Sequence, residues 1–110
     1  MRENDSADVL AHAGYRVEQN PVVPGPKEPD YRIEGRLFDN YAPSTSRGRN
    51  IWELIRREKV AREQANRIIL NLDDSSVTLQ DLKRQFDDWP MPGLLEVIVV
   101  RGGRVIPFWP

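Results

Sequence analysis

Two aspartates frame a hairpin-like segment and are the residues of this sequence best spaced to do chemistry together. Asp30 and Asp39 enclose the run Tyr-Arg-Ile-Glu-Gly-Arg-Leu-Phe, in which apolar side chains flank Gly35. If Glu34 and Gly35 form the turn, Asp30 lies directly opposite Asp39. If Gly35 and Arg36 form it, both carboxylates still lie on one face, whereas a three-residue turn sends them to opposite faces.

Two carboxylates on one face of a hairpin need a compensating charge. Like charges that face one another across strands are destabilising. A divalent cation such as Mg²⁺, Mn²⁺ or Zn²⁺ compensates them, because hard cations prefer carboxylate oxygens and can then activate water. The spacing therefore favours a metal site at Asp30 and Asp39. Two solvent-facing aspartates at strand ends are the alternative on spacing alone.

An arginine-rich stretch follows the second aspartate. Of 16 basic residues, 13 are arginine, although the formal net charge of the chain is −1. The basic residues between positions 44 and 62 outnumber Glu53 and Glu58 and are Arg47, Arg49, Arg56, Arg57, Lys59 and Arg62. The planar guanidinium matches phosphate geometry, so this stretch indicates phosphate recognition. A solvated helix face is the alternative.

Length and composition set the limits within which these residues must be positioned. A chain of 110 residues, 39% hydrophobic and 30% charged, predicts one globular domain. It has no cysteine and one histidine, which excludes disulfide scaffolds, thiolate zinc sites and histidine-pair catalysis. No apolar run approaches 18 residues, so we expect no transmembrane span.

The periodicity predicts an alternating order of helices and strands, α-β-β-β-α-β-α-β-β. The expected helices cover residues 5–13, 50–66 with Asn50 as the cap, and 78–86; the expected strands cover 15–19, the two arms of 30–39, 67–72, 94–100 and 104–109. Strand 67–72, helix 78–86 and strand 94–100 form a βαβ crossover. The fold class is therefore α/β, with a central mixed sheet flanked by helices.

The residues around Asp30 resemble a known nuclease pattern. A Pro29-Asp30 pair at a strand start, an acidic residue on the next strand and a cation-rich helix are the layout of the PD-(D/E)XK nuclease superfamily. The chain departs from that pattern two residues after Asp39, where Tyr41 stands in place of the usual lysine. Lys59, on the following helix, is the nearest replacement.

A longer run resembles one family in particular. Gly14-Tyr15, Asn20-Pro21, the segment from Pro29 to Ser44, Asn50-Ile-Trp, Gln64-Ala and Arg67-Ile-Ile-Leu-Asn-Leu together resemble the C-terminal toxin domains of CdiA contact-dependent inhibition proteins. The branch with the greatest similarity contains tRNA nucleases. The resemblance extends over nearly the whole chain. It implies that residues 1–110 form a single toxin domain at the C-terminal end of a larger protein.

The resemblance implies an active site of four residues. These are Glu3 on the first helix, Asp30, Asp39 and Lys59, with Glu3, Asp30 and Asp39 as ligands of one divalent metal ion. The metal-bound water would attack the phosphodiester, and Lys59 would stabilise the charge of the transition state. Another interpretation of Lys59 is an exposed i,i+4 pair with Glu63.

The expected function is that of a metal-dependent tRNA endonuclease toxin. Arg47, Arg49 and Arg56 would contact phosphates that flank the cleaved bond, which predicts strong salt dependence. The toxin would be secreted or delivered from a cell surface, act in the target-cell cytoplasm, and require a small acidic immunity protein in the producing cell. The alternatives are a metal-independent ribonuclease and a noncatalytic module that binds nucleic acid or protein.

Overall fold

The computed structural model describes residues 2–110 as one mixed sheet with helices on both of its faces. The elements follow in the order α1 (Arg2–His12), β1 (Val17–Gln19), β2 (Tyr31–Ile33), β3 (Arg36–Tyr41), α2 (Gly48–Leu54), the π-helical segment η1 (Ile55–Val60), β4 (Arg67–Asn71), α3 (Leu79–Asp88), β5 (Glu96–Arg101) and β6 (Arg104–Trp109). The order and the fold class agree with the sequence-based prediction.

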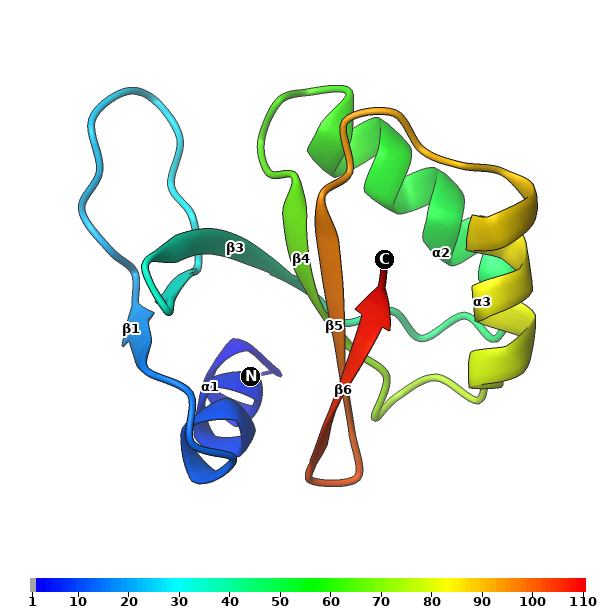
Figure 1. Cartoon of the computed structure of the whole chain (residues 1–110), viewed down its shortest axis with the longest axis horizontal. Coiled ribbons are helices and arrows are strands. Elements are labelled where there is room, and N and C mark those ends of the chain that lie inside the picture. Colours follow the sequence, from blue (N-terminus) through cyan, green and yellow to red (C-terminus); the bar gives the residue numbers. More distant parts are fainter. Residues whose placement is uncertain (1) are drawn as a thin grey trace.

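The six strands are hydrogen-bonded in sequence order, from β1 at one edge to β6 at the other. β3, β4 and β5 run parallel to one another, and the remaining pairs, β1–β2, β2–β3 and β5–β6, are antiparallel. Two crossovers connect the parallel strands, one through α2 and η1 and one through α3. Both lie on one side of the sheet, and α1 lies on the other (Figure 1).

Alternation along the central strand explains why the sheet is covered on both sides. Ile68 and Leu70 of β4 pack in the core beneath α2 and α3, whereas Ile69 packs in the core beneath α1. All three side chains are fully buried. A short strand that is apolar at every position is typical of a strand buried on both faces.

The β2–β3 hairpin has the first of the two registers considered above. Ile33 pairs with Arg36 and Tyr31 with Phe38, so Glu34 and Gly35 are the two turn residues. Both have positive φ, 49° and 82°, as a primed two-residue turn requires. This register brings residues 30 and 39 opposite one another at the open end of the hairpin.

The prediction of one α-helix over residues 50–66 was wrong at both ends. The helix begins at Gly48, with Arg47 rather than Asn50 as its N-cap, and its second half is the π-helical segment η1, which ends at Val60. Glu63 then adopts a left-handed φ of 56°, which breaks the helical path. No glycine or proline marks this end, so the sequence carries no signal for it.

The first helix is also longer than predicted. It begins at Arg2 and therefore includes Glu3.

Within residues 2–110, no helix combines the length and apolar character that a membrane span needs.

Candidate active site

Four separate elements each bring one predicted residue to a single open cleft. Glu3 comes from α1, Asp30 from the entry to β2, Asp39 from β3 and Lys59 from η1. The cleft has a volume of about 600 Å³, and its other lining residues are Glu28, Asn40, Glu58, Arg62 and Gln64. Residues 56 positions apart in the sequence are therefore brought to one site.

Asp39 is the buried centre of this cleft. Asp39 is only 3% exposed to solvent. Its Oδ2 accepts hydrogen bonds from Lys59 Nζ and from Gln64 Nε2, each at 3.1 Å, and its Oδ1 accepts from the Asp30 backbone N–H at 3.3 Å. A buried carboxylate needs such partners, because an uncompensated charge in this position is costly.

Asp30 lies beside Asp39 in a different electrostatic environment. Its Oδ2 accepts the backbone N–H of Asn40 at 2.8 Å. The pKa of Asp30 is raised from an ordinary 3.8 to about 6, first by burial and also by the charges of Asp39 and Glu3, while the hydrogen bond from Asn40 partly offsets these effects. The two aspartates therefore differ: Lys59 compensates Asp39, whereas Asp30 faces two other carboxylates.

A chain of buried polar groups fixes α1, and with it Glu3, against the hairpin. The Tyr31 hydroxyl donates to the Glu3 backbone carbonyl at 2.7 Å. Ser6 donates to Asn40 Oδ1 and accepts from Asn71 Nδ2, both at 2.9 Å. Ser6 and Asn71 are fully buried. Because these bonds connect α1 to β2, β3 and β4, they fix the position of α1 on the sheet and therefore the position of Glu3 at the cleft.

The donor chemistry suits a hard cation, but the carboxylates do not form a ready-made cluster. Within the described part of the chain, no three histidine, aspartate or glutamate side chains converge as ligands of one ion. Asp39 Oδ2 already accepts two hydrogen bonds from side chains. The residues that could hold a divalent cation are thus Asp30 with one adjacent carboxylate, Glu3 or Asp39, and water in the remaining positions.

The predicted phosphate-binding arginines lie outside the cleft. Arg47 and Arg49 are exposed at the start of α2. Arg56 forms a two-pronged pair with Glu53, at 2.6 and 3.2 Å, and lies over the Trp52 ring at 6.0 Å. Its guanidinium is therefore already engaged within its own helix.

Two of the cleft residues without a predicted site role, Gln64 and Arg62, make side-chain contacts there. Gln64 binds Asp39 directly, and Arg62 lines the cleft while pairing with Glu58 at 3.0 Å. Arg62 belongs to the arginine-rich stretch, and Gln64 belongs to the run that resembles CdiA toxins. The sequence therefore pointed to both residues, but it did not predict what either would contact. The expected alternative pair of Lys59 with Glu63 is not the one that forms, because Lys59 turns to Asp39.

Comparison with known proteins identifies the family of this chain. Residues 27–105 match the family described as the contact-dependent growth inhibition CdiA C-terminal domain. A 100-residue region is 51% identical to the "tRNA nuclease CdiA-2" of Burkholderia pseudomallei (strain 1026b), which covers 91% of this chain but 3% of that protein. The chain thus spans a small fraction of the length of this relative.

A solved structure gives the same result in three dimensions. A chain of the "CdiA-CT/CdiI toxin and immunity complex from Burkholderia pseudomallei" superposes with a TM-score of 0.92 and 48% sequence identity, over 99% of this chain and 83% of that one. The resemblance drawn from residues 14–72 is thereby confirmed at the level of the family. The chain belongs to the family of contact-dependent growth inhibition CdiA C-terminal domains.

Proposed function

We propose that this chain is a toxin domain that cleaves phosphodiester bonds of tRNA in the cleft of Glu3, Asp30, Asp39 and Lys59. The observation that carries the proposal is the convergence of these four side chains, with Lys59 held 3.1 Å from Asp39. The 51% identity to a protein named as a tRNA nuclease supports the choice of substrate.

The cationic and anionic residues of the cleft would have different roles in the reaction. The Lys59 ammonium, oriented by Asp39, would donate hydrogen bonds to the phosphoryl oxygens as negative charge builds on them. Asp30, with Glu3 or Asp39, would hold a divalent cation, which supplies an activated water and neutralises charge when bound. Gln64 donates a hydrogen bond to the Asp39 carboxylate and so helps to keep it in place.

A metal-independent ribonuclease is the second candidate, and one observation favours it. Lys59 already compensates the charge of Asp39 without a metal ion. Asp30 could then act as the general base for a reacting hydroxyl, since a carboxylate within hydrogen-bond reach can take its proton. The arginines would serve as phosphate clamps.

The cleavage assay separates these candidates. We expect purified protein to cleave total tRNA with Mg²⁺, Mn²⁺ or Zn²⁺ and to stop with EDTA, and Asp39→Asn to be slower by about 100-fold or more because Lys59 loses its charged partner. The control is Asp88→Asn at the exposed end of α3, which should cleave normally. Circular dichroism of both variants checks folding.

The other outcomes of this assay are equally informative. Cleavage that ignores EDTA but needs Asp39 identifies the metal-independent ribonuclease. Binding of tRNA without cleavage by the folded wild-type protein, with every metal, contradicts the enzymatic proposal and leaves a binding module.

The charge of Asp30 predicts a pH-dependent stability in the metal-free protein. Its folded-state pKa of about 6 exceeds the ordinary 3.8, so the folded state binds more protons between pH 4 and 6, and the free energy of unfolding falls as pH rises through that range. Asp30→Asn, which cannot ionise, should therefore be more stable than wild type at pH 7, by about 1 kcal/mol after allowance for solvent screening at this half-buried site. The difference should vanish near pH 4.

Urea denaturation in EDTA at pH 4, 5, 6 and 7 measures this difference, with Asp88→Asn as the control. The stability difference between Asp30→Asn and wild type should be larger at pH 7 than at pH 4. An equal difference at the two pH values would contradict a raised pKa of Asp30. A divalent cation that binds at Asp30 should raise the melting temperature of wild type but not of Asp30→Asn.

Exposed Arg47 and Arg49 are proposed to contact the phosphates outside the cleft. Using Asp39→Asn to prevent cleavage, we expect Arg47→Ala with Arg49→Ala to weaken tRNA binding and to reduce the slope of log Kd against log salt concentration by about 1 to 2. The matched control is Arg84→Ala with Arg104→Ala, two exposed arginines elsewhere. Equal slopes for the two double variants would argue against an α2 phosphate contact.

We also propose that a producing cell needs an immunity protein and that the toxin acts after delivery into the cytoplasm of a neighbouring cell. The structural relative is a toxin and immunity complex, which supports the partner. Among the side chains that the structure describes, five carboxylates and two cations, Lys59 and Arg62, line the cleft. An acidic partner would therefore make its favourable contacts with these two cations and with the arginines of α2.

Expression in a bacterial cytoplasm tests this part of the proposal. The wild-type gene alone should arrest growth, whereas Asp39→Asn should be tolerated at the same protein level. Normal growth with soluble wild-type protein present would count against a toxin that requires an immunity partner.

A further inference from the structure

A second cavity adjoins the acidic cleft and has a different chemical character. It measures about 450 Å³ and is lined by Lys27, Pro29, Leu37, Phe38, Val60, Glu63, Gln64, Ala65, Asn66 and Gly93. Gln64 lines both spaces. Because Gln64 borders both spaces and Pro29 directly precedes Asp30, the cavity lies beside the proposed site of cleavage.

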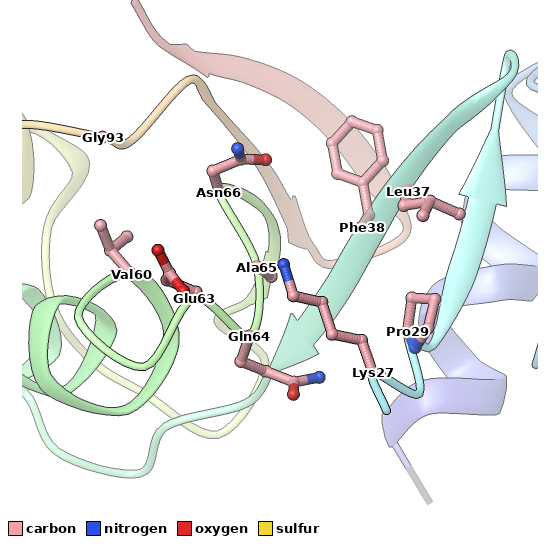
Figure 2. A pocket seen from close by; sticks show the side chains of 10 residues that line it. All are labelled: Lys27, Pro29, Leu37, Phe38, Val60, Glu63, Gln64, Ala65, Asn66 and Gly93. Carbon is pink, nitrogen blue, oxygen red and sulfur yellow. The ribbon is translucent and has the colours of Figure 1, made fainter. Parts of the chain in front are cut away.

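Apolar side chains and carboxamides border the cavity together. Figure 2 shows Leu37 and Pro29 on the hairpin side, Val60 and Ala65 on the side of η1 and the loop that follows it, and Lys27 extending between them. The carboxamides of Gln64 and Asn66 belong to the same loop. Leu37 is 38% exposed. A ligand that covers this side chain would bind favourably there, because removal of apolar surface from water lowers the free energy.

This combination matches the requirements of a nucleobase. Cavities of about 300–1,000 Å³ with apolar walls and a few placed polar groups are typical small-molecule sites. Apolar surfaces receive the face of a base, and asparagine or glutamine carboxamides can pair with the edge of adenine. The rim lysine adds a positive charge where a neighbouring phosphate would lie.

Resting on the proposed ribonuclease activity, we propose that this cavity, the base pocket, takes an unpaired nucleobase adjacent to the scissile phosphate. Leu37 and Val60 would cover the face of the base, and Asn66 would recognise its edge, with adenine preferred. A base stacked and paired within a duplex cannot enter such a cavity. The base pocket therefore directs cleavage to phosphates beside single-stranded positions.

Gln64 connects the base pocket to the acidic cleft. Its amide donates to Asp39 at 3.1 Å while its side chain borders the base pocket. A base in the pocket would contact the same residue that holds Asp39, so the correct nucleotide helps to position the carboxylate next to the reacting phosphate.

The first test measures binding without any catalysis. Methyl NMR spectra of wild-type protein in EDTA are recorded with millimolar adenosine, which is uncharged and so is not repelled by the acidic cleft. We expect saturable shifts at the methyl groups of Leu37, Val60 and Ala65, smaller shifts with cytidine, and none with D-ribose. Leu95, a 49% exposed leucine outside the pocket, should not respond. Absent shifts, or equal shifts at Leu95, would overturn the base pocket.

The second test measures tRNA cleavage by Leu37→Ala and Asn66→Ala, with Leu95→Ala as the matched control. Because Leu37→Ala removes most of the apolar surface that would cover the base, we expect kcat/KM to fall about tenfold for this variant, mainly through KM. Leu95→Ala should match wild type. The exposed position of Leu37 allows the variant to fold, which its melting temperature verifies.

The two tests separate the base pocket from the proposed function. If wild type cleaves tRNA but Leu37→Ala and Asn66→Ala cleave like Leu95→Ala, the base pocket is wrong and the nuclease proposal stands. If wild type does not cleave tRNA, the nuclease proposal fails, and adenosine binding alone decides whether the pocket accepts a base.

Discussion

A buried carboxylate that must be neutralised is the constraint on which the rest of this structure depends. Asp39 lies within the sheet at 3% exposure. Its charge is stabilised there by Lys59 and Gln64, which reach it from outside the strand, and by the backbone N–H of Asp30. Removal of one partner from a buried ion pair leaves the other charge uncompensated, a loss of about 3–5 kcal/mol. The same pair that stabilises β3 therefore holds a cation at the position where a phosphate would bind. Stability and the proposed catalysis share one interaction.

The topology of the sheet makes that interaction possible. β3 and β4 are parallel, so a crossover must pass over one face of the sheet, and this crossover is α2 with η1. Its C-terminal end delivers Lys59 and then Gln64 to β3. α1 covers the opposite face (Figure 1) and brings Glu3 to the same end of the hairpin. The cleft thus forms where elements from both faces meet. The relative with a TM-score of 0.92 has the same architecture.

Charge and shape divide the surface beside Asp39 between two spaces. The acidic cleft gathers ionisable groups whose repulsion is relieved by Lys59 and, in the proposed reaction, by a divalent cation. The base pocket is bounded mainly by apolar side chains and carboxamides, with Lys27 and Glu63 as its charged lining residues, and would recognise a base mainly by contact. Gln64 belongs to both. A nuclease built in this way would use one space for the chemistry and the other to select where it happens.

Local rules were sufficient to predict the hairpin, but not its register. Glycine at position 35 tolerates the positive φ of a primed turn, and the alternation of apolar residues indicates a strand on each side of it, so the sequence by itself determined the hairpin and the succession of helices and strands along the chain. The structure decided which turn forms, and therefore that Asp30 lies opposite Asp39. Similarity to a family then supplied Glu3 and Lys59 as predictions. Tertiary structure alone decided that Lys59 pairs with Asp39 instead of Glu63, that Gln64 joins them, and that the helix widens into η1 and ends at Val60. π-helical turns, which are closed by i→i+5 hydrogen bonds, are rare, and no residue type in this stretch predicts one. A contact between residues 20 positions apart in the sequence, such as that of Lys59 with Asp39, leaves no trace in local spacing. Such features arise only when the crossover packs onto the sheet.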